Sequence, residues 1–140
     1  MRRKIIFLGV LFWCLATCNM VAIAAPEQAC STANQAELNA QIKRVWAEMI
    51  RALAAKDIEK ALTFIVAQSR QHYRDLFAVL YDNLPEIARE IQDIKPLYIK
   101  RNSAKFLIQK AEQYGGQAVT IDYEVYFVLD HDGLWRIDWF

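Results

Sequence analysis

The sequence predicts an α+β fold in which N-terminal helices pack on a curved antiparallel sheet, after an N-terminal signal peptide. Between residues 35 and 91, apolar residues recur every three or four positions, which is the period of an amphipathic helix. After Pro96 the period changes to two, which indicates strands with one buried face. Helices followed by consecutive strands are typical of α+β proteins, so we expect one domain over residues 35–140.

Residues 1–24 have the pattern of a secretory signal peptide. Three cations at residues 2–4 precede an apolar run from Ile5 to Leu15, and Ala22-Ile23-Ala24 supplies small residues for cleavage after Ala24. The cations stay on the cytoplasmic side while the apolar run enters the bilayer. We therefore expect an exported protein, in the periplasm or outside the cell.

Two alternatives change the anchoring of the chain but not its compartment. Leu15-Ala16-Thr17-Cys18 is similar to a lipoprotein box, in which Cys18 would be lipidated and anchor the protein in the cell envelope. The apolar stretch of residues 5–25 is also long enough to remain uncut as an anchor, since about 20 residues span a bilayer. All three outcomes place the domain outside the cytoplasm, and they give the only expected membrane contact.

The net charge argues against a nucleic-acid-binding protein, and the cysteine content argues against an internal disulfide. The chain has 17 basic and 16 acidic residues, and the signal peptide holds three of the basic ones and no acid, which leaves the remaining residues at −2. A domain without net positive charge is not expected to bind nucleic acid. Cleavage after Ala24 leaves Cys30 as the single cysteine, so no internal disulfide is expected. Cys30 falls in residues 25–34, which lack periodicity and which we predict to be a flexible leader.

Four helices are expected next. The first begins near Gln35, the second is capped by Asp57, the third by Ser69, and the fourth starts at Pro85, a residue suited to a first helical position. Their predicted buried stripes are Leu38, Ile42, Val45, Trp46, Met49, Ile50 and Leu53; Ile58, Ala61, Leu62 and Ile65; Tyr73, Leu76, Phe77, Leu80 and Tyr81; and Ile87 and Ile91.

Strands are expected at residues 97–101, 104–113, 119–129 and 134–140. The two glycines of Tyr114-Gly115-Gly116-Gln117 suit a tight hairpin, and a three-residue loop ending at a left-handed Gly133 suits the next turn. Because a one-residue slip would send the apolar set to water, these turns also predict the register. The expected pairs are Phe106–Val125, Ile108–Tyr123, Leu129–Trp135, Val128–Arg136, Phe127–Ile137, Tyr126–Asp138 and Val125–Trp139.

These elements resemble the nuclear transport factor 2-like superfamily, the cystatin-like α+β cone. The resemblance covers residues 35–140 and rests on the first helix with Trp46, the helix join of residues 54–62 and the final Asp132-Gly133-Leu134-Trp135-Arg136-Ile137. It implies a curved sheet wrapped round the helices with a cavity between them, and often a dimer through the outer sheet face. The superfamily contains isomerases, dehydratases, cyclases and hydrolases as well as non-catalytic binding domains, so the fold does not choose the function.

A ligand pocket in such a cone would be lined by core-facing aromatic and apolar residues and would hold a small apolar ligand. Acid–base chemistry there would fall to Tyr123, Tyr73 or His72, although tyrosines at such positions are usually core residues with a hydrogen-bonded hydroxyl. The pocket candidates are Trp46, Met49, Tyr73, Phe77, Phe106, Tyr123, Phe127, Trp135 and Trp139.

No cofactor or metal is expected. His72 and His131 fall in different elements without a partner at ligand spacing, and the Asp130-His131-Asp132-Gly133 turn is explained by hairpin chemistry. The chain also lacks the Gly-x-Ser-x-Gly elbow of serine hydrolases.

The outer sheet face is expected to be more apolar than a fully solvated face requires, which favours a partner and most simply a second copy. Its candidates are Tyr126, Val128, Leu134, Arg136, Asp138 and Phe140. We therefore expect an exported, non-catalytic binding or accessory domain. The alternatives are a small isomerase, dehydratase or hydrolase acting on an apolar ligand, and a structural homodimer module.

Overall fold

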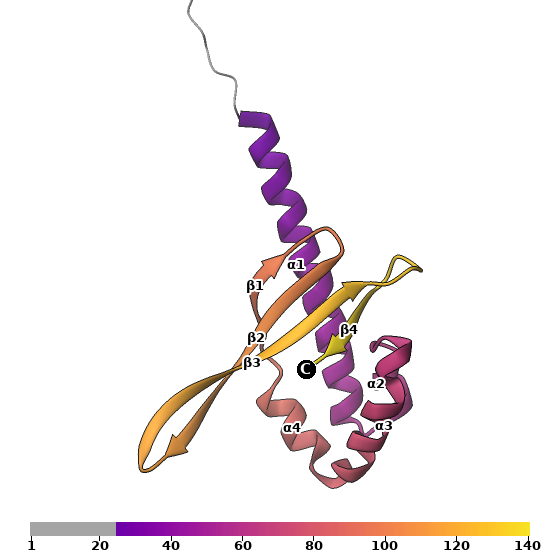
Figure 1. Cartoon of the computed structure of the whole chain (residues 1–140), viewed down its shortest axis with the longest axis vertical. Coiled ribbons are helices and arrows are strands. Elements are labelled where there is room, and N and C mark those ends of the chain that lie inside the picture. The colour runs from indigo at the N-terminus through magenta and orange to yellow at the C-terminus, as the bar shows by residue number, and fades with distance from the viewer. Residues whose placement is uncertain (1–24) are drawn as a thin grey trace, which may run out of the picture.

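The structure, a computed structural model, describes residues 25–140, with side chains described from Ala33 onward. The expected signal peptide and the alternative lipidation at Cys18 lie outside the described residues. Helices come first in the described chain and a single four-stranded antiparallel sheet follows, with strand order β1-β2-β3-β4 (Figure 1). The predicted α+β class with a curved antiparallel sheet is thus confirmed.

The first helix, α1, spans Ala25–Ala54 and therefore begins well before Gln35. Residues 25–34 are helical in the structure, where the sequence predicts a leader without secondary structure. Their alanine, glutamate and glutamine residues have high helix propensity, and Pro26 is tolerated in a first turn. Five residues of the predicted stripe are buried, namely Ile42, Trp46, Met49, Ile50 and Leu53, whereas Leu38 and Val45 are partly buried.

Three shorter helices follow: α2 at Ile58–Leu62, α3 at Arg70–Val79 and α4 at Leu84–Glu90. The predicted cap of α2 is confirmed, because the Asp57 carboxylate accepts a hydrogen bond from the Lys60 amide at 3.1 Å. Ser69 precedes α3 without a side-chain capping bond. In α4 the buried side chains are Leu84 and Ala88, whereas the predicted Ile87 and Ile91 are only partly buried.

The strands are β1 at Lys95–Ile99, β2 at Ser103–Tyr114, β3 at Gln117–Leu129 and β4 at Trp135–Trp139. Gly115, Gly116 and Gly133 have positive φ angles of 59°, 82° and 79°, as the predicted turns require. Five of the predicted pairs are confirmed: Phe106–Val125, Ile108–Tyr123, Leu129–Trp135, Val128–Arg136 and Phe127–Ile137.

The last two predicted pairs, Tyr126–Asp138 and Val125–Trp139, are wrong. The register shifts at a bulge in β4, so Phe127 lies opposite Ile137 but Tyr126 lies opposite Trp139, with Asp138 as the extra residue. A one-residue shift moves every later side chain to the other face. Trp139 therefore leaves the core side and is 47% exposed, while Phe140 turns inward and packs on Trp46 and Tyr73.

The core fills the space between the helices and the inner face of the sheet. Trp46, Phe106 and Phe127 are at most 1% exposed, and their rings meet edge to face at Phe127. The indole N–H of Trp46 donates to the Ile91 carbonyl at 3.0 Å, which ties α1 to the end of α4. Among the described residues, no polar or charged residue is buried in this core.

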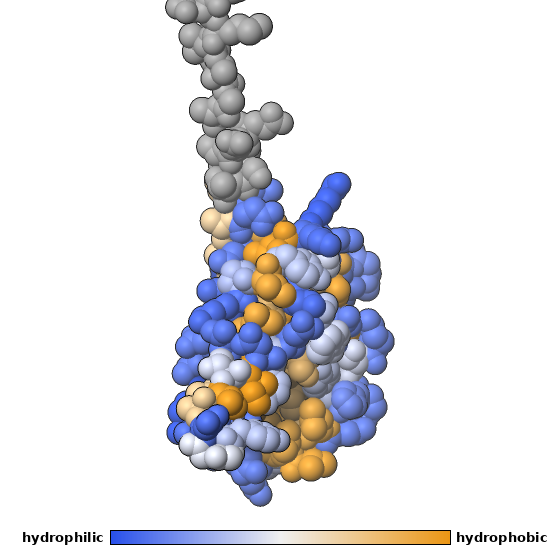
Figure 2. Space-filling model, turned by 60° about the vertical axis from the view of Figure 1, so that its left-hand side comes forward, coloured by the Kyte–Doolittle hydropathy of each residue, from blue (hydrophilic) through white to orange (hydrophobic). Residues whose placement is uncertain are grey.

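The far part of the β2–β3 hairpin projects beyond the helices (Figure 1). We call residues 109–121 the arm. Val119 on its core-side face is 37% exposed, and Tyr114 at its tip is 73% exposed. Apolar side chains stand among hydrophilic ones over the lower part of the molecule when this side is turned forward (Figure 2). The inner face of the arm is therefore not covered by helices, because the helical layer is shorter than the hairpin.

Candidate functional site

The outer face of the sheet carries a row of residues that crosses all four strands. Tyr98 on β1 lies opposite Lys105 on β2, Lys105 lies opposite Tyr126 on β3, and Tyr126 lies opposite Trp139 on β4. The neighbours Ala104, Phe106 and Phe127 on the same strands are fully buried, so alternation along each strand directs the row away from the core. We call these four residues the aromatic row.

Tyr126 is the centre of the aromatic row. Its ring stacks on Trp139 with centroids 4.4 Å apart and planes 21° apart, and the Lys105 Nζ lies 4.4 Å from its centroid. Its hydroxyl donates to the Glu124 carboxylate at 3.0 Å, and Lys105 Nζ donates to the other oxygen of that carboxylate at 3.0 Å. Aromatic stacking and a cation–π contact therefore hold the row in one arrangement.

Lys105 and Glu124 each stabilise the charged form of the other. The hydrogen bonds from Lys105 and Tyr126 hold the pKa of Glu124 below its usual range, and the hydrogen bonds with Tyr126 and Glu124 raise the pKa of Lys105. Both groups therefore keep their ordinary charges at neutral pH more firmly than usual. Such a pair suits binding and orientation, whereas a proton-transfer group needs a pKa near the working pH.

The row is accessible, and apolar and cationic side chains lie beside it together with the Glu124 carboxylate. Trp139 is 47% exposed and Leu97 on β1 is 54% exposed. Lys100 Nζ lies 5.0 Å from the Tyr98 ring centroid, which adds a second cation to the same end of the sheet. A large indole held rigidly at the surface beside a tyrosine has the features of a protein contact site.

The six predicted residues of the outer face separate in the structure. Tyr126 and Val128 lie on that face, and Asp138 is the bulge residue. Arg136 donates to the Asp130 carboxylate and to the Thr63 carbonyl, both at 2.8 Å, and to Asp132, so it connects the β3–β4 turn to the end of α2. Leu134 is 57% exposed in that turn, and Phe140 lies on the inner side.

The three acid–base candidates do not come together. The Tyr73 hydroxyl accepts a hydrogen bond from the Phe140 amide at 2.8 Å, and burial raises its pKa. Tyr123, predicted to face the core, is 45% exposed and donates to Glu112 at 3.0 Å, a bond that raises its pKa. His72 is exposed on α3, with its ring edge against Tyr73.

Most of the nine pocket candidates fill the core. Two lie outside it: Tyr123 stands where the arm leaves the helical layer, and Trp139 lies in the aromatic row. The seven that pack together in the core are Trp46, Met49, Tyr73, Phe77, Phe106, Phe127 and Trp135.

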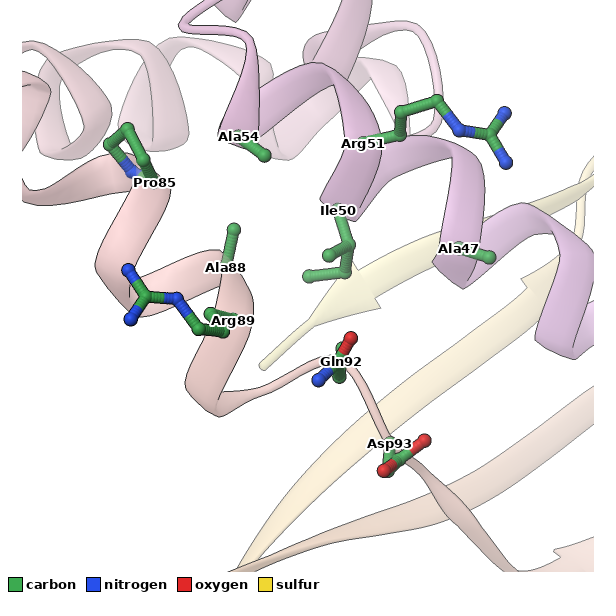
Figure 3. Close-up of a pocket in the computed structure, with 9 residues that line it drawn as sticks. All are labelled: Ala47, Ile50, Arg51, Ala54, Pro85, Ala88, Arg89, Gln92 and Asp93. Atoms are coloured by element: carbon green, nitrogen blue, oxygen red, sulfur yellow. The ribbon is translucent and has the colours of Figure 1, made fainter.

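A surface groove of about 570 Å³ lies between α1 and α4 (Figure 3). Its apolar lining includes Ala47, Ile50 and Ala88. Arg51 lies on the α1 side of the groove and Arg89 on the α4 side. The two guanidinium groups point away from one another in Figure 3, and Arg51 is paired with Glu48. The polar groups therefore do not converge on the groove as they would in a site built for one small ligand.

A second groove, of about 380 Å³, separates α1 from the β3–β4 turn. Phe64, Leu134 and Trp135 line it from one side, with Val45 and Arg44 on α1. Neither groove is expected from the sequence, because each depends on how two distant elements pack.

Sequence reasoning missed most of the aromatic row. It placed Tyr126 on the outer face but not Tyr98, Lys105 or Trp139. The alternation of residues 103–106 is a usable signal for Lys105, since Ala104 and Phe106 on either side of it are apolar. The bulge that brings Trp139 to this face leaves no signal in hydrophobic periodicity.

The described part of the chain holds neither a cluster of metal ligands nor a membrane-spanning helix. Among the side chains described, from Ala33 onward, no three His, Cys, Asp or Glu residues are grouped so that they could hold a metal ion. Within residues 25–140, no helix has both the length and the apolar character needed to cross a bilayer.

Comparison with known proteins gives no assignment: no protein-family model matches the chain, and no curated protein matches it.

Proposed function

We propose that this chain is an exported, non-catalytic binding module that contacts a partner protein through the outer face of its sheet. The observation that carries the proposal is the exposed indole of Trp139, stacked on Tyr126 in a row that crosses the sheet. Tryptophan, tyrosine and rigidly held apolar surface are enriched in the energetic centres of protein interfaces.

The chemistry of the face indicates the kind of partner. Lys95 lies on β1, Lys105 on β2 and Lys100 in the turn between these two strands. Lys105 is held by Glu124, whereas Lys100 rests over an aromatic ring. A partner surface with an apolar centre and an acidic rim would be complementary in both shape and charge.

The tyrosine hydroxyls that an acid–base enzyme would use are engaged within the fold, which favours a binding role. The hydroxyl of Tyr73 is used by the Phe140 backbone and that of Tyr123 by Glu112. The large core side chains are packed against one another with exposures near zero. An acid–base enzyme would instead need two or more such groups aimed at one cavity.

The cell-envelope location is part of the proposal, supported by the cations of residues 2–4, the apolar run after them and the small residues before Ala25. Membership of the nuclear transport factor 2-like superfamily is also proposed, supported by helices that precede a bent antiparallel sheet. The mass of the N-terminal peptide of the exported protein tests the cell-envelope location. A peptide that starts at Ala25 supports cleavage, and one that starts at a lipidated Cys18 supports the lipoprotein alternative.

The binding face is tested by photo-crosslinking in cells that make the full chain. A benzophenone amino acid replaces Trp139 in one variant and Tyr81 in the control, because these side chains are exposed to almost the same extent, 47% and 46%, and lie in different parts of the fold. We expect a discrete higher-mass product from position 139 and none from position 81. A product of twice the chain mass would assign the face to a second copy, and equal labelling at both positions would contradict the proposal.

A further inference from the structure

The arm has two open edges. β1 pairs with β2 only as far as Leu107, and β4 pairs with β3 only from Tyr126 onward. Between these limits β2 and β3 pair with each other alone, through a ladder that continues to Tyr114 and Gln117 at the turn. Alternate backbone N–H and C=O groups along each outer edge of the arm are therefore directed away from the ladder.

The edges of the arm are protected by charged side chains alone, without the proline that β1 has. β1, the edge strand of the main sheet, begins Lys-Pro, and both residues discourage further strand pairing. The arm, residues 109–121, contains two charged residues, Lys110 and Glu112, and no proline. A two-stranded ribbon is only marginally stable in water, so a hairpin of this length gains from further strand pairing.

The sequence of the β2 edge is complementary to itself. If two copies of β2 pair antiparallel about Ala111, Ala111 lies opposite its own symmetry mate. Lys110 then lies opposite Glu112 of the partner subunit, and Glu112 lies opposite Lys110 of the partner subunit. Both side chains are on the same face of β2, as direct cross-strand partners must be. A two-fold interface repeats each contact, so the opposite charges match twice.

Both charged side chains of this edge have partners in their own chain, and both remain partly exposed. Lys110 Nζ lies 2.9 Å from Glu90 and 3.9 Å from Glu112 of its own chain, with 40% of its side chain exposed. The other edge, from Gln117 to Ile121, carries no charge that would select one register. Opposite-charge pairs therefore favour self-pairing through β2 over self-pairing through β3.

We propose that two copies of the chain associate through their arms, with the β2 edges paired antiparallel about Ala111 to form one continuous sheet. This inference goes beyond the proposed function and does not depend on it. In such a dimer both outer faces lie on the same side of the sheet, so two aromatic rows are presented together. A partner with two matching sites would bind with avidity.

Cysteine crosslinking tests the pairing. In the full chain with Cys14, Cys18 and Cys30 changed to Ser, Ala111→Cys places two thiols on the two-fold axis. Directly opposite residues of an antiparallel pair are about 4.5–5.5 Å apart at Cα, within the range of a disulfide. Thr120→Cys is the matched control, because Thr120 lies opposite Ala111 across the arm, on the other edge. In the proposed dimer its two copies are about 14 Å apart, three strand spacings.

We expect mild oxidation to convert Ala111→Cys to a disulfide dimer and to leave Thr120→Cys monomeric on a non-reducing gel. Dimers from Thr120→Cys alone would assign the β3 edge and overturn the proposal. Equal dimer formation by both variants would indicate random collision, and no dimer from either would indicate that the arms do not pair. Each of these results also overturns it.

Charge reversal gives a second, independent readout. Glu112→Lys places like charges opposite each other twice, and we expect it to weaken the dimer about tenfold in sedimentation equilibrium. Adding Lys110→Glu to that variant restores opposite charges and should restore association, with circular dichroism confirming the fold of both. Failure of the double variant to recover would contradict the register. Trp139→Ala should leave association unchanged, which separates this inference from the proposed partner face.

Discussion

The hydroxyl of Tyr73 on α3 accepts a hydrogen bond from the backbone amide of Phe140, at 2.8 Å, while the two rings stack with centroids 4.9 Å apart. This contact fastens the residue after β4 to the helical layer, and it spans 67 positions of the sequence.

Replacing Tyr73 by Phe should therefore destabilise the fold without disturbing the ring stack. We expect a loss of about 1 kcal/mol in the free energy of unfolding, because the Phe140 amide loses its partner. Urea denaturation measures it, with Tyr81→Phe as the control at an exposed site. Equal stability of Tyr73→Phe and the wild type would show that the hydroxyl contributes nothing.

The β4 bulge makes a prediction about deletions. Removing Asp138 leaves Trp139 opposite Tyr126 and Phe140 on the inner side, because the extra residue is the one removed. We expect this variant to fold, with near-native aromatic circular dichroism. Removing Val128 from the regular ladder of β3 should unfold the protein, since it sends later side chains to the wrong face. Similar behaviour of the two deletions would refute the assignment of the bulge.

The two faces of the sheet should respond differently to truncation of an aromatic residue. Phe127 is fully buried, and Phe127→Ala should cost about 3–5 kcal/mol. Trp139→Ala removes an exposed ring and one stacking contact, and should cost about 1 kcal/mol. Thermal unfolding monitored by circular dichroism compares them, and a larger loss for Trp139→Ala would place that residue in the core after all.

We expect Asp130 to make part of the free energy of unfolding sensitive to acid. The hydrogen bond from the His131 amide, followed by those from the His131 and Arg136 side chains, holds the pKa of Asp130 below its usual range. A group whose pKa is lowered by folding stabilises the folded state. This stabilisation is fully present above the ordinary pKa of about 3.9 and is lost as the pH falls through the folded-state pKa. The stability difference between wild type and Asp130→Asn should thus be constant from pH 7 to about pH 5 and shrink below about pH 4.

That difference is measured by urea denaturation across the pH range, with Asp82→Asn as the control, because the Asp82 side chain is almost fully exposed. A gap between wild type and Asp130→Asn that persists unchanged at pH 3 would contradict the assigned direction.

The left-handed turn glycine gives a further prediction. Gly133 has a φ of 79° with open space around the position of a Cβ atom, so Gly133→Ala adds strain without a clash. We expect a loss of about 1–2 kcal/mol. Gly133→Asn should cost less, because asparagine tolerates this conformation better than alanine. Equal costs would indicate that the turn relaxes.

Local chemistry made much of the fold predictable. Asp57 caps α2 because a carboxylate at that position satisfies a free amide, and Gly115-Gly116 closes the hairpin because both residues adopt positive φ. The alternation of residues 123–129 directed Val125 and Phe127 inward, and the turns then set the pairs along β2 and β3. Each of these signals acts within a few residues, so it is readable from the chain.

The sequence by itself determined the order of elements, the apolar faces and most of the register, because these follow from periodicity and turn chemistry. Only the tertiary structure decided that Trp139 lies on the outer face and Phe140 on the inner face, and that Tyr98 and Lys105 join Tyr126 in one row. It also decided that the arm extends beyond the helices that cover the rest of the inner face. A bulge adds one residue without altering the pattern around it, and the reach of a helical layer depends on how distant elements pack. Both are settled by contacts between segments far apart in the chain.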